Sequence, residues 1–293
     1  MKKKLKKISM GDLVMDMVIW LGLTAFAIVC FYPMWYVFVA SITDATELAK
    51  NTGLLFWPEK IDLGGYGLVA ANARIMNSFK NSILILLISL PLNIVMTVLC
   101  AYFLASTGMM FKKPIVMMFM FTMFFSGGLI PGYLNIRSLG LYNTLWSLIL
   151  PGALSLYNAI ICKTAMETIP DSLKESAYID GANDFHIIFK IILPLIKPTL
   201  AVLLLYYGVG HWNSWFSASV YIRDTDKLPV QNILRSILIE NAPVSGAESD
   251  TYNPYSEAIK YAAIMVTTVP VLCIYPFLQK YFAKGAMIGA VKG

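Results

Sequence analysis

Six stretches of this chain contain no Asp, Glu, Lys or Arg over 19 residues or more, and this pattern restricts the fold more than any other feature. A helix needs about 20 apolar residues to cross a bilayer, and lipid offers no water to satisfy free backbone groups. The stretches hold 27, 31, 23, 25, 25 and 19 residues and are Met17–Thr43, Asn81–Phe111, Pro114–Ile136, Ser138–Cys162, Pro198–Ile222 and Tyr261–Gln279. They predict six transmembrane helices, near residues 15–39, 82–106, 114–133, 144–164, 199–221 and 261–281.

The composition agrees with a chain that lies mostly in lipid. Hydrophobic residues make up 58% and charged residues 14% of the chain, whereas soluble domains carry about 25% charged residues. Buried helices of a soluble protein are the alternative, but they run for about 8–20 residues and rarely lack charge on every face. We therefore expect an all-α integral membrane protein with six transmembrane helices.

A basic N-terminus, Met1–Lys7, precedes the first apolar stretch and resembles the charged region of a signal peptide. The first apolar stretch, Met17–Thr43, is longer than the 7–15 apolar residues of such a peptide, so a retained helix is the better interpretation. If both termini lie inside, the inner segments carry 14 basic and 7 acidic residues and the outer segments 9 basic and 10 acidic residues. The positive-inside rule thus predicts cytoplasmic termini in the inner membrane, and the lysines suit lipid headgroups rather than nucleic acid.

Motifs for metal or covalent chemistry are missing from the sequence. His186 and His211 are too few and too scattered for a metal centre, and there is no P-loop, nucleophile elbow or H-E-x-x-H motif. The four cysteines are far apart, and we interpret them as small apolar packing residues: Cys30, Cys100, Cys162 and Cys273.

Two long segments on the outer side, 44–80 and 223–260, contain many turn-forming residues, such as Pro243 and Pro254. Such loops suit contact with a partner or substrate outside the cell. Solvated linkers have the same composition, so the sequence leaves both interpretations open.

The inner segment between the fourth and fifth predicted spans, residues 163–197, has the pattern of two helices joined by a turn. Pro170 marks a helix start, and Ser172 with Glu175 fits a capping box. Gly181 accepts the left-handed conformation that ends many helices. A short helix is therefore expected between Pro170 and Gly181.

The second helix of this segment is expected to start at a cap formed by Asn183 or Asp184 and to end at Leu193–Pro194. Its apolar residues follow the i, i+3, i+4, i+7 pattern of one helix face: Phe185, Ile188, Phe189 and Ile192. This face either binds a partner or folds back onto the inner ends of the membrane helices, and the pattern does not decide between them.

A spaced motif runs through the same segment: Glu175-Ser176-Ala177, three residues, Gly181, nine residues, then Ile191-Ile192-Leu193-Pro194. Membrane subunits of bacterial ABC importers carry E-A-A, three residues, Gly, nine residues and I-x-L-P. The chain resembles this family, with Ser176 in place of the middle Ala as the one departure.

The resemblance implies a type I ABC importer permease fold in which this loop is a coupling helix pair. The loop would sit in a groove of a cytoplasmic ATPase that binds ATP and Mg, so the chain itself would need no cofactor and catalyse no reaction. The residues implied in coupling are Glu175, Ser176, Ala177, Asp180, Gly181, Ile191, Leu193 and Pro194. The alternative role of Glu175 is that of a helix cap.

Four parts of the chain follow from this interpretation. Residues 1–16 form a cytoplasmic basic N-terminus, 17–76 the first helix and an external loop, 77–282 the importer core with its coupling loop at 167–198, and 283–293 a cytoplasmic tail. The tail either reaches the ATPase or is a frayed terminus.

Four further stretches resemble carbohydrate-type permeases of the maltose-type and lipoprotein-transport-like branches: Phe125–Pro131, Leu139–Trp146, His211–Phe216 and Gly289–Gly293. This implies a permease that moves a sugar, most simply an oligosaccharide. The implied partners are a second homologous permease in a heterodimer, two ATP-binding subunits and an external sugar-binding protein.

Substrate contacts are hardest to assign. Trp212, Asn213 and Trp215 end the fifth span and are the candidates, although an interfacial aromatic belt explains the tryptophans equally well. An amide at depth needs partners, and Asn93 and Asn158 raise the same question in other spans. Hydrogen bonds between helices are the alternative for all three amides.

The third span is expected to break near its end, because Gly127, Gly128 and Pro131 disfavour a continuous helix. Such a break would form a re-entrant or gating turn.

Two other classes of function fit less well. A secondary transporter or channel for a small polar solute would place ionisable residues inside the membrane or carry inverted repeats. The charge-free stretches hold no carboxylate. A membrane enzyme would need clustered His, Asp or Glu at the membrane boundary, and the sequence has no such cluster.

Overall fold

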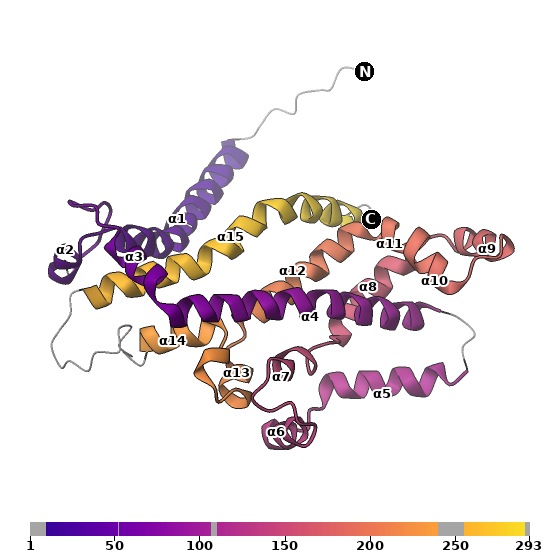
Figure 1. Ribbon diagram of the computed structural model, residues 1–293. Coiled ribbons are helices and arrows are strands. Elements are labelled where there is room, and N and C mark those ends of the chain that lie inside the picture. Colours follow the sequence, from indigo (N-terminus) through magenta and orange to yellow (C-terminus); the bar gives the residue numbers. More distant parts are fainter. Residues whose placement is uncertain (1–9, 52, 107–109, 240–254, 291–293) are drawn as a thin grey trace. The chain divides into compact units, whose positions relative to one another are not determined.

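A computed structural model describes four ranges of the chain, residues 10–51, 53–106, 110–239 and 255–290 (Figure 1). Within them the regular structure is helical, and the one pairing of extended chain is an antiparallel bridge between Thr43 and Ile61. The fold is all-α, as the charge-free stretches predicted. The described residues form two compact units, one within 1–71 and 243–266 and the other within 72–242 and 267–293.

The first unit contains α1 (Met10–Ser41), α2 (Ala45–Lys50), α3 (Gly64–Ala71) and the start of α15 (Tyr255–Ala290). The loop after α2 folds back onto α1, because the indole N–H of Trp35 donates to the carbonyl of Phe56 at 2.9 Å. The core of this unit consists of Val39, Ala40, Leu48 and Leu55. The described residues 44–51 and 53–71 are therefore folded rather than an open linker, whereas residues 240–254 lie outside the described ranges.

The second unit is built around α4 (Ala73–Ala105), which packs against α8 (Leu156–Glu167) and α12 (Lys197–Asn213). The other elements of this unit, besides the rest of α15, are α5 (Lys112–Phe124), α6 (Leu129–Ser138), α7 (Trp146–Ile149), α9 (Asp171–Ile179), α10 (Asp184–His186), the π-helix η1 (Ile187–Ile192), α11 (Leu193–Leu195), α13 (Phe216–Tyr221), the 3₁₀ turn η2 (Thr225–Lys227) and α14 (Val230–Ile239). Cys100 and Cys162 are buried in it as packing residues, as expected, whereas Cys30 and Cys273 are exposed in the chain alone.

Three helical segments of the described chain are long and apolar enough to cross a membrane by themselves: Leu13–Ser41, Ala73–Ala105 and Glu257–Ile274. Two bent pairs qualify only when each is taken as one span. They are α5 with α6, and the segment Asp184–Leu195 with α12. The expected count of six is not reached by this measure, since the fourth predicted span, 144–164, consists of α7 and the 12-residue α8 with a break between them.

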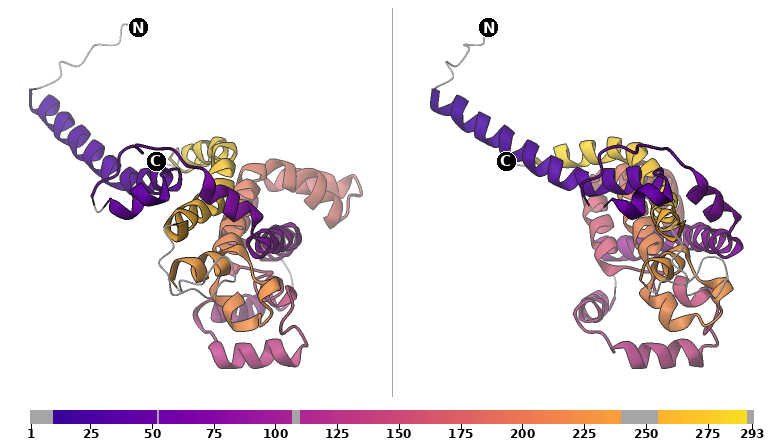
Figure 2. Two further views of the ribbon diagram at one scale, coloured as in Figure 1. Left: turned by 60° about the vertical axis from the view of Figure 1, so that its left-hand side comes forward. Right: turned by 90° about the vertical axis from the view of Figure 1, so that its left-hand side faces the viewer.

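The third predicted span is broken where the glycines indicated. α5 ends at Phe124, α6 begins at Leu129, and the two axes form an angle of 115° (Figures 1 and 2). Gly128 has a φ of +89°, a left-handed conformation that a residue with a β-carbon adopts with difficulty. The expected break is confirmed.

The break between α7 and α8 is closed by side chains of α4 and α12. Asn93 on α4 is fully buried, and its amide donates to the carbonyls of Gly152 at 2.6 Å and Ala153 at 3.0 Å. Tyr207 on α12 accepts a hydrogen bond from the backbone N–H of Ser155 at 3.0 Å. These bonds supply partners for backbone groups that lipid would leave unsatisfied. The expectation that Asn93 bonds between helices is confirmed.

Asn93 also bonds to a third element, since its carbonyl oxygen lies 3.0 Å from Nε2 of His211 on α12. The hydroxyl of Tyr207 lies 2.6 Å from that of Thr97 on α4. The polar cluster therefore ties α4, α12 and the chain before α8 into one body.

Replacing Asn93 by Leu should destabilise the protein, because the carbonyls of Gly152 and Ala153 would lose their donor. We expect a loss of about 1–3 kcal/mol, measured by thermal unfolding of the purified chain in detergent. Thr164→Val is a matched control, since Thr164 is exposed on α8 and bonds within its own helix. Equal stability of the two variants would contradict the role assigned to Asn93.

Candidate functional site

The loop between α8 and α12 begins with the short helix α9. Pro170 is the residue before the helix, as expected, but no side chain caps its N-terminus. The predicted capping box is wrong, because the helix starts at Asp171 and Ser172 already lies within its first turn. Glu175 instead lines a groove of about 290 Å³ beside Tyr102 at the end of α4, so the alternative role as a helix cap does not apply.

The turn after α9 depends on Gly181, as predicted. Its φ is +81°, and the backbone N–H of Ala182 donates to the carbonyl of Ala177 at 2.9 Å. The N–H of Gly181 donates to the carbonyl of Tyr178 at 3.0 Å. This pair of bonds is the Schellman ending of a helix, which needs a left-handed residue at the position of Gly181.

The second helix of the loop starts at Asn183, whose side chain accepts a bond from the N–H of His186 at 2.8 Å. The predicted apolar face is wrong in detail. Ile188 and Ile192 are buried, but Phe185 and Phe189 are 64% and 58% exposed. The π-helix η1 winds wider than an α-helix, so it brings Ile187 instead to the buried side.

The buried isoleucines fold back onto the membrane helices, which answers the question that the sequence left open. Ile187, Ile188 and Ile192 share one core with Val98 and Ala101 of α4 and with residues of α8, α9 and α12. The same loop also keeps an apolar surface that points away from this core. Its residues are Ile179, Phe185 and Phe189, of which Ile179 is 86% exposed.

A cluster of two tyrosines and an aspartate joins the loop to the end of α4. The hydroxyls of Tyr102 and Tyr178 both donate to Oδ1 of Asp184, at 2.6 Å and 2.5 Å. These bonds lower the pKa of the Asp184 carboxyl below its ordinary value of 3.8 and raise the pKa of Tyr178. Tyr102 comes from α4, Tyr178 from α9 and Asp184 from α10, so three elements meet at one carboxylate.

The helical chain ends at Leu195, one residue beyond the expected end at Leu193–Pro194. The bend lies at Ile196, where the segment Asp184–Leu195 meets α12 at 86°. Ile196 is buried in the core, which fixes this angle.

The structure brings the residues implied in coupling together on this loop, in three different settings. Five of these residues are exposed: Glu175, Ser176, Asp180, Gly181 and Pro194. Ala177 is buried under α9, and Ile191 and Leu193 are half-buried against the core. Figure 1 shows α9 at one end of the second unit, beyond α8 and opposite the end that holds α13 and α14. Sequence reasoning missed the contact of Tyr102 with this loop. The available signal was a phenol hydroxyl at the end of the predicted span 82–106, where it can bond to the loop that follows a neighbouring span.

The three candidates for substrate contact are separated by the structure. Trp212 is 6% exposed, and its indole N–H donates to the carbonyl of Thr267 at 3.2 Å. It lines an apolar groove of about 410 Å³ with residues of α4 and α15, so it packs between helices. Asn213 and Trp215 are exposed at the end of α12, and Asn158 is buried in α8.

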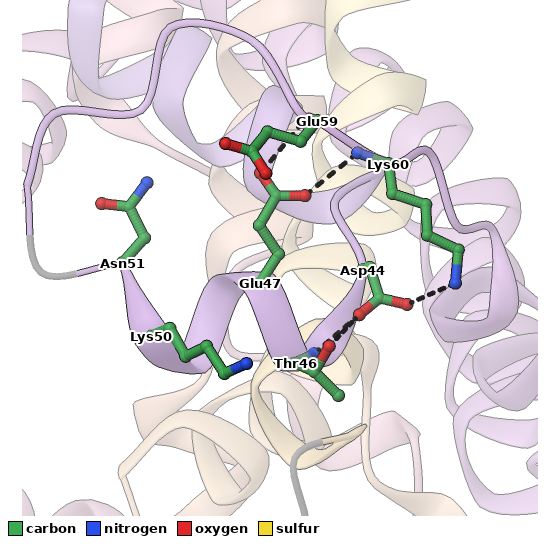
Figure 3. Close-up of a pocket in the computed structure, with 7 residues that line it drawn as sticks. All are labelled: Asp44, Thr46, Glu47, Lys50, Asn51, Glu59 and Lys60. Carbon is green, nitrogen blue, oxygen red and sulfur yellow. Dashed lines mark hydrogen bonds and ion pairs between the residues drawn. The ribbon is translucent and has the colours of Figure 1, made fainter.

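A third hollow, of about 440 Å³, is lined by polar side chains and belongs to the first unit (Figure 3). The carboxylate of Glu47 accepts bonds from the backbone N–H groups of Glu59 and Lys60. Bonds from Thr46 lower the pKa of the Asp44 carboxyl to about 2, and Asp44 also pairs with Lys60. These carboxylates brace their own loop. The described residues contain no group of His, Cys, Asp or Glu that suits a metal ion.

Comparison with known proteins now decides the family. Residues 67–287 match the binding-protein-dependent transport system inner membrane component. This chain belongs to that family. It is a permease component of an ABC importer, as the motif around Gly181 implied, and it is an integral membrane protein.

The relatives of this permease are similar over nearly their whole length. The polygalacturonan/rhamnogalacturonan transport system permease protein YtcP of Bacillus subtilis (strain 168) is 39% identical, and the match covers 97% of this chain and 100% of YtcP. Protein LplC of the same organism is 39% identical over 89% of both chains. A crystal structure of a bacterial ABC transporter involved in the import of the acidic polysaccharide alginate contains a chain with a TM-score of 0.86 and 29% identity, covering 94% of this chain and 98% of that one.

Asp184→Asn should loosen the loop of this permease. In the native protein the lowered pKa means that the carboxylate stabilises the fold at pH values above its ordinary 3.8, and this contribution is lost as the pH falls through the lowered pKa. Because the carboxylate is solvent-exposed, we expect only a two- to fivefold gain, roughly, in tryptic cleavage after Lys190 at pH 7.

Asp180→Asn is the control, because Asp180 loses the same charge but its carboxylate has no hydrogen-bond or ion-pair partner among the described residues. Equal cleavage of Asp184→Asn and the native chain would show that the carboxylate does not hold the loop.

Proposed function

We propose that this chain is one half of the membrane pore of an ATP-driven importer of a sugar, most simply an oligosaccharide. The observation that carries the proposal is the loop at Gly181. It contains the importer motif, and its helix α9 lies at one end of the second unit. The names of the relatives add support, because YtcP is named for polygalacturonan and rhamnogalacturonan and the solved importer for alginate.

The apolar surface of Ile179, Phe185 and Phe189 is the proposed contact with a cytoplasmic ATPase. Exposed large apolar side chains next to a polar rim are typical of protein interfaces. The rim here consists of Glu175 and Asp180, which stay in solvent. The motif residues with buried side chains support the surface from below.

Rigidity of the loop is what makes it suitable for transmitting motion. Its isoleucines are packed into the core of α4 and α8, and Asp184 bonds it to the end of α4. A force on α9 is thereby passed to membrane helices rather than absorbed by a flexible turn. In the proposed cycle the ATPase pair closes on ATP, the two coupling loops of the pore approach each other, and the pore opens outward.

Energy and the delivery of cargo come from other subunits in this proposal. Two ATP-binding subunits hold ATP and Mg, so the chain is a non-catalytic subunit without a cofactor. A second, homologous permease completes the pore as a heterodimer, and an extracytoplasmic sugar-binding protein delivers the cargo. Both termini lie in the cytoplasm, as the positive charge of the inner segments favours.

Gly181→Asp and Glu175→Lys should leave membrane insertion intact and abolish most sugar uptake. Asp tolerates left-handed backbone better than most residues, so the first variant chiefly adds a charge at the interface. We expect the ATPase to bind about tenfold more weakly or worse, since an unpaired charge in an interface costs at least about 1.4 kcal/mol.

The measurement is co-purification of the ATPase from membranes together with uptake of labelled sugar by whole cells. Ser176→Ala is the matched control, because it restores the common form of the motif and should keep both activities. Native uptake by both charged variants would refute the assignment of this loop to coupling.

A further inference from the structure

Arg235 lies on α14, at the end of the second unit opposite the coupling loop, and packs against an aromatic ring. The guanidinium carbon of Arg235 lies 3.9 Å from the ring centre of Trp215. Within residues 10–51, 53–106, 110–239 and 255–290, no carboxylate forms an ion pair with it. A cation held by an aromatic ring alone keeps its N–H donors available for a ligand.

The helix that carries Arg235 is fixed in place. α14 buries Val230, Ile233 and Ile237, and the N–H of Val230 donates to Oγ of Ser82 on α4 at 2.9 Å. The opposite face of the helix is left for Arg235 and, one turn earlier, Gln231.

The segment that follows α12, which contains Trp215 and α13, is held by the same helix α14. The side-chain amide of Asn232 donates to the carbonyl of Trp215 at 3.0 Å and to Oγ of Ser219 at 2.9 Å. These bonds fix the backbone of Trp215 beside α14, next to Arg235. The arrangement is ready before any ligand arrives, which keeps the entropic cost of binding low.

Two amides complete the group. Nε2 of Gln231 donates to Oδ1 of Asn213 at 3.5 Å, a long bond that a ligand hydroxyl can replace. Asn213 and Trp215 are exposed, so the group is open to solvent or to a pathway. A planar guanidinium matches a carboxylate with two parallel bonds, and amides match hydroxyls. A sugar acid presents both kinds of group on one ring.

We propose that Arg235, Trp215, Asn213 and Gln231 form a subsite for the carboxylate and hydroxyls of a uronate unit on the substrate path of this permease. The proposal rests on the proposed function and specifies its cargo as an acidic oligosaccharide. α14 lies within the segment 223–260 that the sequence predicts on the outer side, where a cation meets water rather than hydrocarbon. The place of α14, opposite the coupling loop, puts the subsite at the proposed outer entrance (Figure 1).

The test is equilibrium dialysis of the purified transporter, with every subunit that co-purifies, against trigalacturonate and its methyl ester. The ester keeps the hydroxyls and removes the negative charges. We expect the native protein to bind the acid at least about tenfold more tightly than the ester, and Arg235→Gln to lose this preference. Arg235→Lys should recover part of it, because it keeps the charge without the planar fork.

Arg223→Gln is the control. Arg223 is exposed in the chain between α13 and α14, so the variant removes the same charge nearby without touching Trp215. It should bind both probes as the native protein does. Trp215→Phe tests the support of the guanidinium and should weaken binding of the acid more than that of the ester.

Three results would overturn the subsite: no preference of the native protein for the acid, an unchanged preference in Arg235→Gln, or an equal loss in Arg223→Gln. Sugar uptake by whole cells and co-purification of the ATPase are measured on the same samples. If both persist while the native protein shows no preference, the subsite is refuted and the importer function stands. If neither is found in the native protein, the importer function itself fails.

Discussion

Every backbone donor and acceptor inside a bilayer needs a partner within the protein, and the interrupted span between α7 and α8 shows how this chain supplies such partners. Between α7 and α8 the backbone leaves the helical ladder, and Asn93 and Tyr207 supply the missing bonds. Because these side chains come from α4 and α12, closing the break also fastens three elements to one another. Apolar contact alone would fasten them weakly, since lipid tails are as apolar as the helices.

α4 forms hydrogen bonds with other elements near both of its ends. Near its start, Asn81 and Ser82 bond to the chain around η2 and α14, and near its end Tyr102 bonds to Asp184 of the loop. A helix of 33 residues is about 50 Å long, which exceeds the thickness of the hydrocarbon core. One continuous helix thus contacts the loop at Gly181 near one end and the neighbourhood of α14 near the other.

Sequence reasoning succeeded where one residue type has one physical use. Gly181 and Gly128 occupy left-handed positions, and Asn183 caps a helix, because few other residues can do so. It failed at Phe185 and Phe189, because a period of 3.6 residues was assumed where the chain forms a π-helix. The break in the fourth span was also missed, since the backbone there is satisfied by Asn93 and Tyr207, which are 59 and 52 residues from their partners in sequence. Contacts of that range leave no local pattern in a sequence.

Coupling and recognition place opposite demands on polar groups in such a chain. A transporter that takes its energy from an ion gradient needs titratable groups inside its spans, whereas one driven by a separate ATPase does not. The proposed coupling loop has features of shape that do not depend on the cargo: a glycine turn, packed isoleucines and an 86° bend. Charge is then free to serve selection. A guanidinium that rests on an indole, on the face of α14 away from the core, has no structural bond to give up when it meets an anion.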